Sequence, residues 1–110
     1  LSAIKLWQKE LSFCQTLLDG TAKYFDSPED KKKISHFQNL FLYYHAELLI
    51  AFRAKLRNHE LHLADIMRNQ NVSDSPYYRE HTQLMTELEG FSRQFGELKG
   101  EFFKFIERIK

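Results

Sequence analysis

The fold follows from one long stretch, PYYREHTQLMTELEGFSRQFGELKGEFFKFIERI, which occupies residues 76–109. Within this stretch, a series of mostly apolar side chains recurs at alternating intervals of four and three residues. These are Tyr77, His81, Leu84, Leu88, Phe91, Phe95, Leu98, Phe102, Phe105 and Ile109. This spacing places them on one side of an α-helix, and its length is typical of helices that pack in coiled-coil fashion. Phenylalanine at many of these seam positions favours a bundle thicker than a two-stranded zipper.

Two further helices are predicted upstream of this stretch, over residues 2–25 and 28–70. The seam of the first contains Ile4, Trp7, Leu11, Cys14, Leu18, Thr21 and Phe25. The seam of the second contains Ile34, Phe37, Phe41, Tyr44, Leu48, Phe52, Leu56, His59, Leu63 and Ile66. A run of four-residue steps from Tyr44 to Leu56 is a stutter, which predicts a local unwinding of the left-handed supercoil.

Short polar breaks separate the predicted helices. Ser27 and Pro28 stand at the first break and Ser75 and Pro76 at the second. A serine that caps exposed backbone N–H groups, followed by proline in the first turn, is a helix start signal. Gly20 weakens the end of the first helix. We therefore expect the helices at about 2–25, 28–70 and 76–109, with a bend or fraying near residue 20.

Short connections make consecutive helices antiparallel, so the predicted fold is an all-α, up-down-up three-helix bundle forming a single domain over residues 1–110. The second and third helices are longer than the first, and part of that pair would lack cover within the chain. A homodimer is the expected solution, because two-fold dimers are the commonest assemblies. The candidate interface residues are Tyr43, Leu49, Ile50, Gly96, Gly100 and Phe103.

Composition excludes several classes of protein. Sixteen basic and fifteen acidic residues give a net charge of +1. The chain therefore lacks the excess of basic residues expected of a nucleic-acid-binding protein. Apolar runs are too short to cross a membrane, and neither nucleic acid nor membrane is expected as a partner. Cys14 is the single cysteine, so an internal disulfide is impossible and a cytoplasmic location is expected. Because the sequence starts at Leu1, we expect residues, or a signal peptide, to precede it.

Histidine provides the strongest candidate chemistry. His59 and His62 lie one helical turn apart, with Asp65 one turn further. Helical bundles house carboxylate–histidine metal sites, so a bundle metal-binding protein that uses His59 and His62 is one alternative function. The Glu-x-x-His motif of di-iron bundles and the His-Glu-x-x-His motif of zinc proteases are both absent. Cys14 lies among core positions, and we predict no catalytic residues, cofactor or resident metal.

A second alternative arises from Gly96-Glu97-Leu98-Lys99-Gly100. This pentapeptide resembles the His-x-Leu-Lys-Gly motif of histidine phosphotransfer domains, which are helical bundles of similar size. Glycine replaces the histidine that would accept the phosphoryl group, so transfer at this position is impossible. The resemblance implies at most a non-catalytic signalling module of phosphorelay type.

Two segments support a further resemblance. Trp7-Gln8-Lys9-Glu10-Leu11-Ser12-Phe13 and His36-Phe37-Gln38-Asn39-Leu40-Phe41 resemble segments of small, uncharacterised all-helical proteins of Bacteroidota. The resemblance covers the first half of the chain and implies a bacterial, cytoplasmic, helical protein without transferable catalytic residues. It suggests that Gln38 and Asn39 bond to the first helix, at the indole N–H of Trp7 or at Glu10. The leading hypothesis is a non-enzymatic protein that acts through helix-mediated association with itself or with a partner.

Overall fold

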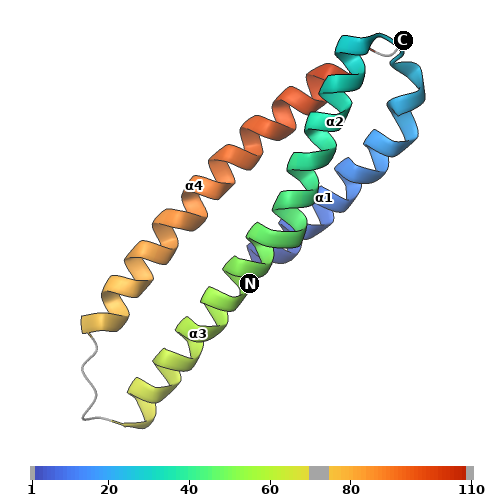
Figure 1. The fold of residues 1–110 in the computed structure, drawn as a ribbon. Helices are drawn as coiled ribbons and strands as arrows, with labels where there is room; N and C mark the ends of the chain where they lie inside the picture. Colours follow the sequence, from blue (N-terminus) through green and yellow to red (C-terminus); the bar gives the residue numbers. More distant parts are fainter. Residues whose placement is uncertain (1, 70–74, 109–110) are drawn as a thin grey trace.

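The computed structural model describes residues 2–69 and 75–108, which form long helices packed side by side (Figure 1). No strand occurs in these two ranges, and the prediction of an all-α fold built from three helices is confirmed. The second of the three is continuous through three consecutive helical segments. The elements are α1 (Ser2–Thr21), η1 (Ala22–Tyr24), α2 (Pro28–Tyr43), η2 (Tyr44–Leu48), α3 (Leu49–Arg68) and α4 (Ser75–Ile106).

The helix ends lie close to the predicted ones. After Gly20 the α-helical hydrogen bonding of α1 stops at Thr21, and a 3₁₀ turn, η1, continues the chain. At the start of α2 the Ser27 hydroxyl accepts a hydrogen bond from the backbone N–H of Asp30 at 3.1 Å, and Pro28 takes the first helical position. The predicted cap and proline are therefore confirmed. The predicted ends at residues 70 and 109 lie outside the described residues.

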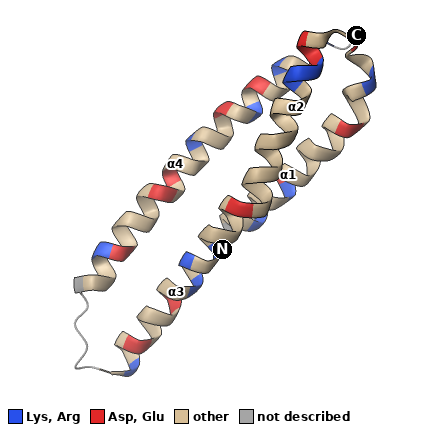
Figure 2. Cartoon of the chain, viewed as in Figure 1, with Lys and Arg blue, Asp and Glu red and all other residues tan. Residues whose placement is uncertain are grey.

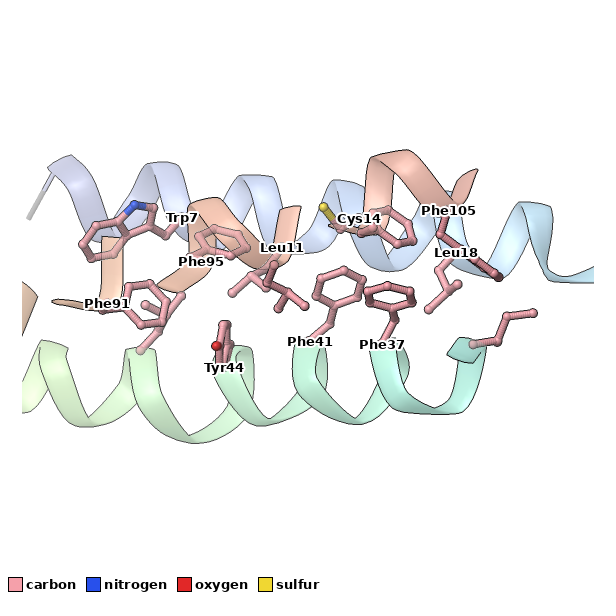
Figure 3. Packing of buried hydrophobic residues seen from close by; sticks show 14 of the residues in the cluster. Trp7, Leu11, Cys14, Leu18, Phe37, Phe41, Tyr44, Phe91, Phe95 and Phe105 are labelled. Carbon is pink, nitrogen blue, oxygen red and sulfur yellow. The ribbon is translucent and has the colours of Figure 1, made fainter. Parts of the chain in front are cut away.

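Aromatic rings fill the core where all three helices meet (Figure 3). Phe102 of α4 lies edge-on to Phe37 and Phe41 of α2, with ring centroids 5.3 and 5.0 Å apart. At the other end of α1, Trp7 meets Phe91 edge-on at 4.7 Å. Such pairs add about 0.5–1.5 kcal/mol each to the stabilisation by apolar burial. The seam phenylalanines thus form the core of a three-helix bundle.

Helix α1 covers only one end of the longer pair. The molecule measures 64 × 19 × 18 Å, and Figure 1 shows the N-terminus of α1 near the middle of that length. Near there Phe91 contacts both Trp7 and Phe52. Beyond these contacts α3 and α4 continue as a two-helix hairpin. We name residues 53–68 and 75–90 the distal arm.

A π-helical turn, η2, changes the register of the long helix. Because a π turn accommodates an extra residue, the buried position after Tyr44 falls on Leu49 instead of Leu48. Leu49 is fully buried and Leu48 is half-buried. The expectation that Leu49 lies off the seam, available to an interface, is therefore wrong. The π turn lies at the start of the stutter, at Tyr44–Leu48.

Polar contacts join the three helices around the core. Lys99 of α4 contacts Glu10 of α1 at 2.6 Å, and His45 Nδ1 lies 3.1 Å from Gln15 Oε1. Gln38 and Asn39 are exposed, and among the described residues neither makes the hydrogen bond to α1 that the sequence suggested, so that prediction is wrong. The Arg108 guanidinium makes two bonds to Asp30 and, mainly through these, lowers the pKa of that carboxyl group.

Candidate functional site

Five side chains of the distal arm form one connected polar cluster. His59 and His62 come from α3, and Tyr77, Glu80 and His81 come from the first turns of α4. His59 Nδ1 lies 2.8 Å from Glu80 Oε1, and His59 Nε2 lies 3.0 Å from His81 Nδ1. His62 Nδ1 lies 3.3 Å from the second carboxylate oxygen of Glu80. We call these five residues the histidine cluster.

Helical spacing explains why the cluster forms. His59 occupies a seam position of α3 and faces α4, while His62 follows it by one turn on the same side. Tyr77 and His81 are seam positions of α4, four residues apart, so both rings face α3. The Tyr77 ring stacks on His59, with centroids 4.2 Å apart and planes at 6°. Stacking on one side and hydrogen bonds at both ring nitrogens fix the orientation of His59.

His59 is buried, with 5% of its surface exposed, and it is the buried polar residue of the described ranges. A buried imidazole must have hydrogen-bond partners for both of its nitrogens. An ionised carboxylate only accepts, so His59 Nδ1–H donates to Glu80. The hydrogen bonds from His59 and, to a smaller extent, from His62 lower the pKa of Glu80. The carboxylate is therefore ionised at neutral pH and orients both histidines.

The remaining ring nitrogen of His59 completes a relay of hydrogen bonds. When both rings are neutral, His59 Nδ1 carries its proton toward Glu80, and Nε2 accepts from His81 Nδ1–H. This assignment of tautomers follows from the hydrogen-bond network. The series Glu80–His59–His81 links a carboxylate, a buried imidazole and an exposed imidazole. Such a series can accept or release a proton at its exposed end without breaking.

The structure alters the predicted metal site. His59 and His62 are brought together, but Asp65 bonds to Arg68 instead of joining them. In residues 2–69 and 75–108, no group of three or more histidine, cysteine, aspartate or glutamate side chains is arranged to hold a metal ion. The two carboxylate oxygens of Glu80 bond instead to the Nδ1 atoms of His59 and His62.

Sequence reasoning missed Tyr77, Glu80 and His81 as members of the cluster. A signal for Tyr77 and His81 was present, because both are seam positions that follow the second break. Which of these seam residues would lie level with His59 depends on the register between the two helices, and the periodicity within one helix does not give that register. Glu80 carried no such signal, since it lies beside the seam in a helix rich in carboxylates.

The candidate interface residues differ in exposure. Tyr43 and Ile50 are exposed on the long helix, whereas Leu49 is buried. Gly96 and Gly100 lie on the outside of α4, where a Cβ atom would meet no neighbour within 4 Å. Phe103 lines a shallow pocket together with Phe13 of α1.

Cys14 is buried in the core, as predicted. Burial raises the pKa of the thiol, which keeps it protonated and makes it a small apolar side chain rather than a nucleophile. Its neighbour Lys99 opposes this increase and Glu10 adds to it. Cys14 therefore contributes packing.

Comparison with known proteins adds no relative. No protein-family model matches the chain, and neither the characterised proteins nor the solved structures show a significant similarity to it. In the part of the chain that the structure describes, no helix has the length and apolar character needed to cross a bilayer.

Proposed function

We propose that this is a non-enzymatic helical protein that acts by self-association, with the distal arm of one copy packed against that of a second. One observation carries the proposal. Leu49, Leu56, Leu63 and Met67 follow each other at steps of seven, seven and four, and so lie on one stripe of α3. Leu49 is 0% exposed, Leu63 is 39% exposed and Met67 is 75% exposed. The apolar stripe thus continues after the cover provided by α1 has ended.

Helix α4 adds apolar surface to the same arm. Tyr78 is exposed there, and Met85 is half-buried. A two-helix hairpin cannot bury its apolar stripe alone, whereas two hairpins form a four-helix bundle. Exposed apolar area of this kind, continuous with a core, is typical of association surfaces.

The distribution of charge supports a second copy of the chain as the partner that packs against the distal arm. Helix α3 carries four basic and two acidic side chains, and residues 75–90 of α4 carry one basic and three acidic side chains. Figure 2 shows the two signs interspersed along both helices. In a two-fold antiparallel pair, α3 of each copy can lie against α4 of the other. The net charges of +2 and −2 are then adjacent, which favours this pairing.

The remaining interface candidates stay as predictions. Tyr43 and Ile50 on the long helix, and Gly96, Gly100 and Phe103 on α4, lie outside the stripe of Leu49 and Met67. They are available to a wider contact of the same dimer or to a protein partner. The coiled-coil character expected of the long helices belongs to the same proposal, as does the cytoplasmic location.

A charge placed on the stripe tests the proposal. We expect the wild-type chain to have twice its 13.2 kDa mass by light scattering at high micromolar concentration. The double variant Leu63→Glu, Met67→Glu should be monomeric, because each carboxylate would lose its hydration in the interface. Both residues are already exposed, so the fold should be retained and the circular dichroism unchanged.

The matched control is Leu42→Glu, Leu61→Glu, which adds the same charge at two leucines that are exposed on other faces of the long helix. This control should remain dimeric. A wild-type chain that is monomeric at several hundred micromolar would refute the proposal. Equal dissociation of the two double variants would refute the assignment to this stripe.

A further inference from the structure

The hydrogen bond between His59 and His81 exists only while a single proton lies between their two facing ring nitrogens. A hydrogen bond between two ring nitrogens needs one donor and one acceptor. His59 Nε2 and His81 Nδ1 lie 3.0 Å apart. When the two rings together carry one added proton, one of these two facing nitrogens still lacks hydrogen and accepts the bond from the other. With two added protons, both nitrogens carry hydrogen, and two N–H groups of two cations face each other across that distance.

We propose that the distal arm is a pH-sensitive latch, closed while the His59–His81 pair carries at most one added proton and opened when both rings are protonated. Opening therefore requires acidification, because it requires both imidazoles to carry an added proton. The open state separates the α3 and α4 faces around Tyr77 and exposes their seam residues. The inference depends on contacts within one chain and is independent of the proposed dimer.

The surrounding charges support this response. On α3 the neighbouring titratable groups are Lys55 and His62, and on α4 they are Tyr77, Glu80 and Glu87. Lys55 is bound to Glu87 at 3.0 Å, which leaves Glu80 as the carboxylate that contacts His59 and His62. Glu80 stabilises the first added proton, on His59. A second positive charge, on His81, would lie on the side of His59 away from this carboxylate.

Glu80 itself does not produce the transition. Its pKa is lowered from the ordinary glutamate value, so its contribution to folding is complete above that value and is lost only as the pH falls through the lowered pKa. The loss therefore falls below the range in which a glutamate ordinarily titrates. Opening above that range thus reports the imidazole pair and not Glu80.

The two ends of the molecule differ in stability, and we expect only the less stable end, the distal arm, to open. The other end holds three helices around packed phenylalanine rings, whereas the arm holds two helices and the buried imidazole of His59. Elements with less apolar burial open at lower free energy. Protonation of the pair should therefore release the distal arm while α1, α2 and the second half of α4 stay packed.

Amide hydrogen exchange of the full chain, followed by NMR from pH 8 to pH 5 with EDTA present, tests the latch. Protection factors remove the intrinsic pH dependence of exchange. We expect protection in residues 53–68 and 75–90 to fall by about tenfold to a hundredfold on acidification, the effect of losing a hydrogen bond to a charged group. Protection around Phe41 and Phe95 should change much less. Proportional loss in both regions would overturn the proposal.

His81→Asn identifies the group responsible, because the amide can donate to His59 but cannot take up a proton. The pH response of the arm should disappear. His36→Asn is the matched control at an exposed histidine of α2, and it should keep the wild-type response. Acid opening of His81→Asn over the same pH range would overturn the assignment.

Glu80→Gln provides a second test, which remains valid even if the distal arm of the His81→Asn variant does not close normally. Glutamine keeps the acceptor oxygen but removes the charge that favours the first added proton. The closed arm then binds that proton less tightly, and opening should move to higher pH. An unchanged midpoint would contradict the latch. Each measurement repeated in Leu63→Glu, Met67→Glu separates the latch from self-association.

Discussion

Phe102 and Phe103 show how much the position of a residue matters in this protein. Both are phenylalanines of α4 and are adjacent in the chain. Phe102 is fully buried between the rings of Phe37 and Phe41, while Phe103 is 38% exposed. One helical step of 100° separates a central core residue from a surface residue.

We expect Phe102→Ala to lower the free energy of unfolding by about 3–5 kcal/mol, because it removes a buried ring and leaves a cavity. Phe103→Ala should lower it by less than about 1 kcal/mol, since much of its ring already contacts water. Urea unfolding followed by circular dichroism measures both values. Similar losses in the two variants would contradict the placement of α4.

His59 illustrates the limit of sequence reasoning at the scale of one residue. It occupies a seam position, and the structure shows it buried with hydrogen bonds at both ring nitrogens. Its partners could not be identified from α3 alone, because Glu80 and His81 belong to another helix. Their positions depend on the register across the connection between α3 and α4, and periodicity within a single helix contains no information on that register.

At the scale of elements, local chemistry predicts helix starts well. Ser27 and Pro28 act within one turn, so the start of α2 could be read from neighbouring residues. The π turn was harder to locate. The stutter indicated a change of winding near Tyr44, but whether it would be spread along the helix or concentrated in one turn depends on packing against α1 and α4. The misplacement of Leu49 follows from that difference.

Deletion of Ala46 tests the role of the π turn. Removing one residue from Tyr44–Leu48 should restore ordinary α-helical bonding while it keeps Tyr44 and Leu49 on the buried face. The free energy of unfolding should change by about 1 kcal/mol or less. Deletion of Ala54, an exposed alanine in the regular helix α3, should rotate all later residues of α3 by about 100°.

The Ala54 deletion should therefore disrupt the distal arm, with loss of protection at His59 and its neighbours. Circular dichroism and hydrogen exchange measure both outcomes. If the Ala46 deletion is as harmful as the Ala54 deletion, the extra residue is not absorbed by the π turn.

At the scale of the whole molecule, stability should decline from one end to the other. The end with Phe41 and Phe102 has three helices, whereas the arm with His59 has two. We expect amide protection at pH 7 to be highest in α2 and in the second half of α4 and at least about tenfold lower in the distal arm. Hydrogen exchange of the monomeric Leu63→Glu, Met67→Glu variant measures this gradient. Uniform protection would show that the hairpin and the bundle open as one unit.

The elongated shape also has a hydrodynamic consequence. The radius of gyration is 18.6 Å, a value that a compact domain reaches only at about 270 residues. A single copy of this chain should therefore leave a gel-filtration column as early as a globular protein of more than twice its mass. An early peak would be the signature of a rod and not of a pair of subunits, so a column calibrated with spherical standards cannot count the copies.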